Sequence, residues 1–551
     1  MNLNPNNEII YDLCIVGAGP AGLITALEYA KSNSDKIVLI IEFGSKNNKN
    51  VANALDDTIV NNNPINHHEP YECTNKGFGG SSASWGGRCV MYDEIDFLQR
   101  DVIGDDCTWD IKILNELKPF LNKSSEYFEC GSSVFNLNDI EDFKNTRIAE
   151  GFKEGIVLDS IIERWSMPTR FESRYLSKVE KLKNIHVLSG FLLNHFVEPS
   201  ISGFISVAQL ENVKTKELLY IKATNFVIAC GTQESTRLLL KNKHLFSNLK
   251  EVPKSLGHYY QGHISGKIAT VKFKGDPSKT NFGFLREIDG TYIRRRFQFS
   301  TKYLKENNLL NIAIWLDNPL YHEPSHNSGA MSFMYLAMIT PILGKKLAPP
   351  SIAYSITKGK VVSIHKHLWN IIKGFPLSII TPAVIFYKRY LLKRKLPGVF
   401  LYSPNNSYAL HFHAEQLPVY SNKMSLDQKG DNLLIDYSIS PEDINSVIRS
   451  HKALDTYLRE CGCGYLDYWF PEDELFTEIN KMTKDGIHQS GTTRIADSEE
   501  KGVLDKNLKV FGTSNVFVCS SSAFPTSGQA NPTYLLGAFA ARLANHLSQK
   551  K

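Results

Sequence analysis

"YDLCIVGAGPAGLITALEYAKS", residues 11–32, is the stretch of sequence that decides the fold. It predicts an apolar strand from Leu13 to Val16, a glycine-rich turn of the form GxGxxG, and an apolar-periodic helix that ends near Ala30. In such a unit the glycines permit a tight turn and let a pyrophosphate approach the N-terminus of the helix. The stretch therefore predicts a dinucleotide-binding domain.

The next strand supplies the acid that such a domain uses to hold a ribose. "KIVLIIEF", residues 36–43, ends its apolar run at Glu42, twenty residues after the last glycine of the turn. A carboxylate at this position accepts a hydrogen bond from a ribose hydroxyl. No second GxGxxG occurs in the chain, which favours a single dinucleotide. We expect it to contact Gly17, Gly19, Pro20, Ala21, Gly22 and Glu42.

A second glycine-rich segment points to a flavin. "GFGGSSASWGGRCVMYDEIDF", residues 77–97, places five glycines and three serines around Trp85. Such a loop lets the backbone approach a large flat ligand, and the embedded aromatic residues argue against a flexible linker. We expect cofactor contacts from Gly79, Gly80, Ser81, Ser84, Trp85 and Gly86.

Composition and the N-terminal sequence limit the class of protein. The 551 residues are 42% hydrophobic and 22% charged, which suits a globular chain of two or more lobes. The first ten residues are polar, without a basic region before an apolar stretch, and no run of 18 apolar residues occurs. We therefore expect neither export nor a membrane-spanning helix, and a cytoplasmic protein.

Four segments together resemble the glucose-methanol-choline (GMC) family of FAD-dependent oxidoreductases. They are GAGPAG, GGSSASWGGRC, "VIACGTQESTRLLL" at residues 227–240, and the C-terminal segment that begins "HQSGTTRIAD" at residue 488. The resemblance covers the flavin-binding half of such enzymes in the right order. Residues 266–480 match far less, and in this family that region forms the substrate domain.

The resemblance implies an α/β fold of two domains. A Rossmann-like FAD-binding domain is built from the discontinuous segments 1–112, 185–262 and 484–551. The substrate domain takes 113–184 and 263–483, with a mainly antiparallel sheet and covering helices. The alternating stretches "SGKIATVKFKG" and "TYIRRRFQFS" suit such a sheet.

The resemblance also implies a catalytic pair. The family carries a histidine in an H-x-x-G-T segment and a second polar residue, His or Asn, some forty residues later. Here His488 opens HQSGTT and Asn531 opens NPT, 43 residues further on. Oxidising an alcohol requires a base to take the hydroxyl proton while hydride leaves the same carbon for the flavin. We predict His488 as that base and Asn531 as its partner.

Further cofactor positions follow from the same resemblance. Many relatives carry an aspartate where this chain has Ser520, and some sugar oxidases attach FAD through a histidine where this chain has Ser84. We therefore expect non-covalent FAD. The helix that follows Asn531 should present its N-terminus to the flavin, where its dipole stabilises negative charge. The remaining predicted contacts are Ala229, Gly231, Ser520, Ser521, Asn531, Pro532 and Thr533.

Other polar residues are weaker candidates. Glu415 could orient the base, although a surface acid at a strand end is the simpler reading. His263, His411 and His413 suggest a metal site. However, histidines within "ALHFHAE" that have no defined third ligand are more often hydrogen-bonded residues of a sheet, so we expect no metal. Four residues could line the active-site entrance: Arg164, Trp165, Arg170 and Phe171.

These features predict an FAD-dependent oxidoreductase that converts a CH–OH group to a carbonyl. A sugar or glycoside is the favoured small-molecule substrate, and sterol or lipid-linked alcohols are the alternative. The electron acceptor stays open between oxygen, a quinone and another protein, with a dehydrogenase favoured. A flavin monooxygenase or amine oxidase would share GAGPAG without requiring His488 and Asn531, and a non-catalytic flavoprotein would not need to keep both.

One segment lies outside the resemblance. Residues 324–414 contain no Asp or Glu but 11 Lys and Arg, in a chain whose formal net charge is +5. The cations flank apolar stretches that are too short to span a bilayer. We hypothesise that residues 330–395 form a cap that docks on the inner membrane surface, or grips a phosphate-bearing or lipid-linked substrate. A buried helical hairpin with a basic rim is the alternative, and no motif supports nucleic-acid binding.

Overall fold

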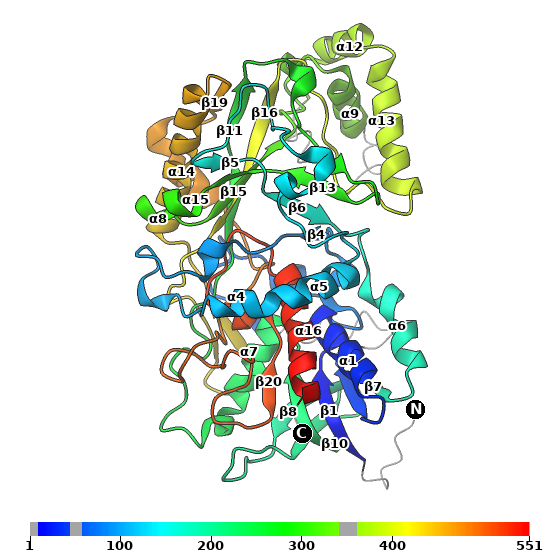
Figure 1. Ribbon diagram of the computed structural model, residues 1–551, viewed down its shortest axis with the longest axis vertical. Helices are drawn as coiled ribbons and strands as arrows, with labels where there is room; N and C mark the ends of the chain where they lie inside the picture. The colour runs from blue at the N-terminus through cyan, green and yellow to red at the C-terminus, as the bar shows by residue number, and fades with distance from the viewer. Residues whose placement is uncertain (1–8, 45–57, 341–356, 358–360, 550–551) are drawn as a thin grey trace.

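The computed structural model describes residues 9–44, 58–340, 357 and 361–549. The chain forms two halves, each with a hydrophobic core of its own (Figure 1). The lower half in Figure 1 holds the mainly parallel sheet and both ends of the described chain, and the upper half holds a mainly antiparallel sheet. The predicted α/β architecture of a Rossmann-like domain joined to an antiparallel domain is confirmed.

The lower sheet has the strand order β7-β2-β1-β10-β9-β8, and β20 pairs with β10. β7, β2, β1, β10 and β20 run parallel to one another, whereas β9 pairs antiparallel with both β10 and β8. β1 and β2 are almost wholly buried, as expected for parallel strands covered on both faces. The strands are β1 Ile10–Val16, β2 Val38–Glu42, β7 Ile185–Ser189, β8 Phe191–Phe196, β9 Val207–Asn212, β10 Leu218–Ile228 and β20 Val516–Val518.

Helices from distant parts of the sequence cover this sheet. α16, the last helix, packs against both α1 and α5 (Figure 1). The predicted helix after the GxGxxG turn is therefore present and is held by the C-terminus of the chain. The helices are α1 Pro20–Ser32, α4 Lys112–Leu117, α5 Leu121–Phe128, α6 Phe171–Lys181, α7 Gly231–Lys241 and α16 Thr533–Gln549.

Residues 113–184, predicted as part of the substrate domain, are divided between the two cores. Leu117, Phe128 and Phe171 belong to the core of the lower half, whereas Phe152 and Val157 belong to the upper core. The apolar faces of α4 and α5 are covered by α16, which lies about 400 residues later in the chain.

The upper sheet has the strand order β19-β11-β16-β15-β14-β5, all antiparallel. The helices of this half are α8 Thr301–Glu306, α14 Pro441–Glu460 and α15 Leu475–Met482. Its strands are β5 Val157–Leu158, β11 His263–Phe273, β14 Phe297–Phe299, β15 Ile312–Asp317, β16 Ser407–Glu415 and β19 Gly464–Tyr468.

Two small sheets complete the fold. One has the order β12-β13-β6-β4 and the other β17-β18-β3. Their strands are β3 Ile59–Asn61, β4 Arg88–Cys89, β6 Ile162–Trp165, β12 Leu285–Arg286, β13 Tyr292–Arg295, β17 Lys423–Leu426 and β18 Leu433–Asp436, and the short helix α3 spans Pro70–Cys73.

The hypothesised cap lies at the far end of the upper half, where α9, α12 and α13 gather (Figure 1). α9 spans Gly329–Ile339, α12 Ile364–Lys373, and α13 Leu377–Phe386 with a π-helical continuation to Leu391. Residues 341–356 and 358–360, with Lys345, Lys346, Lys358 and Lys360, lie outside the described residues. Within the described part of the chain, no single helix is long and apolar enough to cross a membrane. α12 and the Leu377–Leu391 helix, bent by 91°, pass that test only as a pair.

Candidate active site

A cavity of about 380 Å³ opens where the GxGxxG turn, the end of β2 and the N-termini of α7 and α16 meet. It is the cavity predicted for the dinucleotide. The predicted cofactor residues that line it are Gly17, Gly19, Pro20, Ala21, Glu42, Gly80, Ser81, Trp85, Ala229, Gly231, Ser520, Ser521, Pro532 and Thr533. The predicted residues that do not are Gly22, Gly79, Ser84, Gly86 and Asn531.

The GxGxxG turn leaves room for a ligand at the start of α1. Gly17 has a φ of +103°, and a Cβ atom there would lie 2.5 Å from the carbonyl oxygen of Ala229. A Cβ built on Gly19, by contrast, would meet no atom within 4 Å. Gly17 therefore lets the turn pack on the adjacent strand, while Gly19 faces open space in the cavity.

Glu42 is fixed at the end of β2 by backbone donors. Its carboxylate accepts hydrogen bonds from the N–H groups of Ala18, Gly44 and Gly77 at 2.8 to 3.0 Å. Burial raises the pKa of Glu42, and these three hydrogen bonds oppose that rise. The contacts tie the GxGxxG turn, β2 and the second glycine-rich loop into one cradle.

Arg170, which was predicted to line the active-site entrance, instead holds the second glycine-rich loop. Its guanidinium donates to the carbonyl oxygens of Ser82 and Trp85 at 2.8 and 2.7 Å. Ser84 accepts a 2.6 Å hydrogen bond from the side chain of Asn75. Arg164 is also structural, because its buried guanidinium pairs with Glu287 and donates to the carbonyl oxygen of Val134.

His488 and Asn531 meet at the edge of the cavity. The amide nitrogen of Asn531 lies 2.6 Å from His488 Nε2. The residues beside them, Ile487 and Pro532 among them, line the cavity, so the pair lies where the cofactor cavity adjoins the antiparallel half. Asn531 Oδ1 is buried and has no hydrogen-bond partner among the described residues. The side chain of His488 is 24% exposed, which leaves its ring accessible to a small molecule.

Asp485 holds the loop that carries His488. Its Oδ1 accepts hydrogen bonds from the N–H groups of Gly486, Ile487 and His488. Its Oδ2 accepts one from the N–H of His263 and lies 3.6 Å from His488 Nδ1. Burial raises the pKa of Asp485, but the charges and hydrogen bonds of His488 and His263 outweigh it and hold that pKa well below its usual value. Asp485 was not among the site residues predicted from the sequence, although it lies only three residues before His488.

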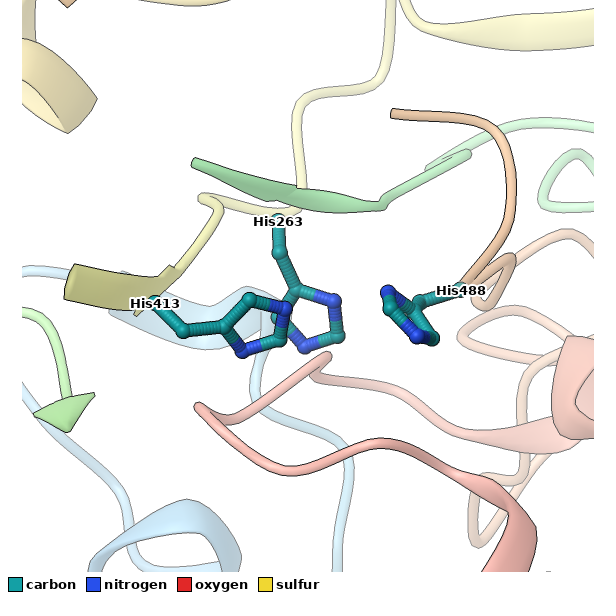
Figure 2. A group of neighbouring side chains, drawn as sticks. All are labelled: His263, His413 and His488. Carbon is teal, nitrogen blue, oxygen red and sulfur yellow. The ribbon is translucent and has the colours of Figure 1, made fainter. Parts of the chain in front are cut away.

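Two further histidines face His488 from neighbouring strands. Figure 2 shows His263 on β11 and His413 on β16, with the ring of His488 opposite them. The rings of His263 and His413 are 4.0 Å apart between centroids and tilted by 31°, and His488 meets both edge-on. Burial holds the pKa of His413 well below its usual value, and the nearby charges of His263 and Arg88 add to that effect. Burial likewise lowers the pKa of His263, which favours the neutral form of both rings.

The prediction that no metal is bound was made because no third ligand could be identified from the sequence. In the structure, His488 lies beside His263 and His413 and completes a group of three histidines. His263, His413 and His488 each offer a ligand atom, all within 4.8 Å of one another. However, the rings of His263 and His413 lie 4.0 Å apart between centroids with a tilt of 31°, so they contact each other face to face more than they radiate from a common ion as in a tetrahedral site. His488 Nε2 is also engaged by Asn531. The geometry fits neutral imidazoles that shape a pocket wall beside the base.

Glu415, which was considered as an acid that could orient His488, forms its hydrogen bonds with other residues. It lies buried at the end of β16, where its two oxygens accept hydrogen bonds from Arg100 at 2.7 Å each. It also accepts from the N–H of Asn311. Glu415 is therefore neither a helper acid nor a surface residue, but half of a buried ion pair between the two halves of the molecule.

The cavity fits the FAD that the sequence predicts. The N-terminus of α1 with its open Gly19 suits a pyrophosphate, and Glu42 lies at the strand end where a ribose hydroxyl is bound in such folds. The N-terminus of α16, at Thr533, lines the same cavity beside His488 and Asn531. These residues would hold the dinucleotide and place a flavin ring beside the histidine.

Comparisons with known proteins agree with this interpretation. Residues 419–540 match the family model described as GMC oxidoreductase. A 2-methyl-1,2-propanediol dehydrogenase of Mycolicibacterium austroafricanum is 34% identical over 65 residues, a match that spans only 12% of each chain. The resemblance to the GMC family is confirmed.

Solved structures match over the whole length. A fungal aryl-alcohol oxidase has a TM-score of 0.52 at 14% identity and covers 98% of this chain and 99% of its own. Pyridoxine 4-oxidase from Mesorbium loti has a TM-score of 0.51 at 14% identity, covering 97% and 99%. A formate oxidase of Aspergillus oryzae RIB40, studied for its FAD modification, has a TM-score of 0.52 at 14% identity, covering 98% of each chain. At this identity the solved structures show the fold, and the family model supports the GMC resemblance over residues 419–540.

Proposed function

We propose that this protein binds FAD and oxidises a CH–OH group to a carbonyl, with His488 as the base and Asn531 as its partner. The observation that carries the proposal is the 2.6 Å contact between His488 and Asn531 beside a cavity lined by the GxGxxG turn. A flavin monooxygenase or amine oxidase would need the turn but not this pair.

The pair can hold and deprotonate an alcohol. Asn531 donates to His488 Nε2, which leaves that nitrogen unprotonated and able to accept a proton. A substrate hydroxyl that enters between them would accept the amide hydrogen bond and donate its own proton to His488 Nε2. Asp485 then lies on the far side of the ring, 3.6 Å from Nδ1, where its charge stabilises the imidazolium.

Bound FAD would supply the acceptor for the hydride that leaves the same carbon. The alcohol thereby loses one proton to His488 and one hydride, a two-electron oxidation that yields the carbonyl. His263 and His413 present neutral rings to the same space, so they add no competing positive charge beside the base.

We further propose that FAD is held without a covalent bond. Ser84 occupies the position of the attachment histidine in the related sugar oxidases; its hydroxyl accepts a hydrogen bond from Asn75, and Ser84 itself does not line the cavity. Acid precipitation of the purified protein should therefore release all the flavin into the supernatant. Yellow colour retained in the washed pellet would contradict this.

Anaerobic mixing with candidate alcohols tests the catalytic proposal. Reduction bleaches the flavin absorbance, and His488→Ala should slow that bleaching by about 100-fold to 10,000-fold, the range for loss of a general base. His68→Ala, which changes a histidine near the surface, is the matched control. If no alcohol bleached the bound flavin, the non-catalytic alternative would stand. Slow reoxidation of the reduced protein in air-saturated buffer would support a dehydrogenase, and reoxidation within milliseconds an oxidase.

A further inference from the structure

The cap helix α12 turns its apolar face outward. Its buried side chains are the polar His367 and Asn370. Trp369 is 64% exposed and Ile372 66% exposed, and Ile364 and Leu368 are exposed as well. In a helix on the surface of a globular protein the apolar stripe faces the core, so the polarity of α12 is inverted.

Hydrogen bonds fix this inverted orientation. His367 Nδ1 lies 2.9 Å from the hydroxyl of Ser332 on α9, and Asn370 donates to the carbonyl oxygen of Pro324 at 2.9 Å. Because buried polar groups need such partners, rotating α12 to bury its apolar face would leave them unsatisfied. The outward apolar face is therefore built into the cap.

α13 continues the same surface. Its buried residues are Ser378 and Pro382. The Ser378 hydroxyl donates to the carbonyl oxygen of Ile371 on α12, which joins the two helices. The exposed apolar residues of this stretch that do not line the cavity beneath the helices are Phe375, Leu377, Ile380, Val384, Tyr387 and Leu391. A contiguous apolar surface of this size marks an interaction site.

The charged residues that α12 and α13 themselves contribute are all positive, and Glu323 is a carboxylate that lines a hollow together with Lys366 and Trp369. Residues 324–414 contain no carboxylate, and Arg389 and Arg394 donate to backbone carbonyl oxygens. Within the described residues, no ion pair to a carboxylate is formed by Lys366, Lys373, Lys388, Lys393 or Lys395. An apolar helix pair rimmed by unpaired lysines is complementary to a bilayer with anionic headgroups.

A large cavity lies beneath the same helices. It measures about 1840 Å³ and is lined on the cap side by Met334 and Met338 of α9 and by Ile379 and Phe386 of α13. His411 of β16 lines its opposite side. The cavity thus lies between the outward-facing helices and the antiparallel sheet that carries the histidine cluster.

A row of packed aromatic rings lies between this cavity and His488. His411 stacks on Trp315 at 4.5 Å, and Trp315 lies 6.4 Å from His413. His413 in turn meets His488 edge-on at 5.3 Å. The cavity under the cap therefore borders the wall of the catalytic pocket.

We infer that α12 and α13 dock on an anionic membrane surface, and that the cavity beneath them admits a bulky lipid-soluble alcohol to His488. The docking does not depend on the chemistry, whereas the substrate class rests on the proposed function. The large cavity with its apolar cap side favours this class over the sugar suggested by the sequence.

Flotation of the purified full-length protein with liposomes tests the docking. At about 50 mM salt we expect at least tenfold more protein to float with liposomes containing about 30% anionic lipid than with neutral ones, and the difference to vanish at about 500 mM. Lys388, Lys393 and Lys395 changed together to Gln should lower the partition coefficient about 100-fold. The matched control changes Lys216, Lys254 and Lys302 to Gln, which alters the net charge equally at exposed sites elsewhere.

The contribution of the apolar face of α12 to docking is tested with one double variant and one control double variant. Trp369→Asp with Ile372→Asp should abolish flotation, whereas Ile201→Asp with Ile288→Asp, at residues 100% and 98% exposed, should not. All four positions are exposed, so the substitutions leave the core intact. Equal flotation with anionic and neutral liposomes, or equal loss in both variant pairs, would overturn the docking.

Flavin reduction tests the substrate class. We expect a long-chain or polycyclic alcohol presented in liposomes to bleach the flavin at least tenfold faster than a sugar. Ala337→Phe and Ala383→Phe, which narrow the cavity, should each lower the ratio of long-chain to short-chain alcohol reduction at least tenfold. Faster reduction by a sugar would overturn the substrate class and leave the alcohol chemistry standing, whereas no reduction by any alcohol would overturn the proposed function and leave the docking standing.

Discussion

Replacing Asp485 by asparagine tests how the protein stabilises the protonated base. The substitution keeps the shape of the side chain and removes one charge. Asp485 Oδ2 lies 3.6 Å from His488 Nδ1, and the two side chains are 6% and 24% exposed. At an effective dielectric constant of about 20, a full charge pair at that distance is worth about 4.6 kcal/mol.

The expected loss is smaller than this ceiling. An asparagine keeps a dipole toward the ring, and water reaches the partly exposed imidazole of His488. We therefore expect the barrier to proton and hydride loss to rise by roughly 2 kcal/mol, which slows flavin reduction about 30-fold. The rate–pH profile should also shift, because the imidazolium formed during the reaction loses its counter-charge.

Stopped-flow reduction under anaerobic conditions measures the effect. The flavin content of Asp485→Asn should equal that of the unmodified protein, since Asp485 does not line the cofactor cavity. Asp443→Asn is the control, because Asp443 is equally buried but caps α14, accepting from the N–H groups of Ser440 and Leu417. An Asp485→Asn protein that bleached as fast as the control, with the same pH profile, would refute the role given to this carboxylate.

Three further outcomes are expected. Glu415→Gln should lower the free energy of unfolding by about 3–5 kcal/mol, measured by denaturant titration, because it leaves the buried Arg100 guanidinium without its charge partner. Burial holds the pKa of His451 at about 4, below the value of about 6.5 in an unfolded chain. The folded state therefore binds fewer protons in this range, so roughly 3 kcal/mol of stability present above pH 6.5 is lost as the pH falls to 4, and thermal scans of His451→Phe should show a flatter pH dependence. Elemental analysis should find no stoichiometric zinc or copper, and a chelator should leave flavin reduction unchanged, because the rings of His263 and His413 contact each other at 4.0 Å and His488 Nε2 is engaged by Asn531. One equivalent of metal per chain would contradict this.

The fold could be predicted best where its signals are local. The β1–α1–β2 unit was expected from two successive stretches, residues 11–32 and 36–43, and Leu13, Val16 and Glu42 lie in the strands that those stretches predicted. Residues 113–184 were assigned to the substrate domain, but part of this segment packs in the core of the lower half. The reason is that α4 and α5 are amphipathic helices whose partner is the distant α16. Apolar periodicity shows that a helix has a buried face but not which core buries it.

The candidate site likewise combines residues that local sequence motifs predicted with residues that only the three-dimensional structure brings together. The spacing of His488 and Asn531 was visible in the sequence, and the two side chains are in contact. The convergence of His263 and His413 depends on strand register, since β11 pairs His263 with Glu415 on β16 and thereby places His413 two residues away on the same face. Sequence alone shows such residues without the register that brings them together.

The cap raises a question that composition alone could not settle. The pattern of α12 is equally compatible with a core helix, because an amphipathic helix can turn its apolar face either way. The buried His367 and Asn370 decide the direction, since both have partners only when the apolar face points outward. Leaving a large apolar side chain exposed forgoes roughly 1.5–3 kcal/mol that its burial would contribute. Trp369 and Ile372, each about two-thirds exposed, would gain part of this energy from any surface that covers them, and the unpaired lysines around them select a surface that is negatively charged.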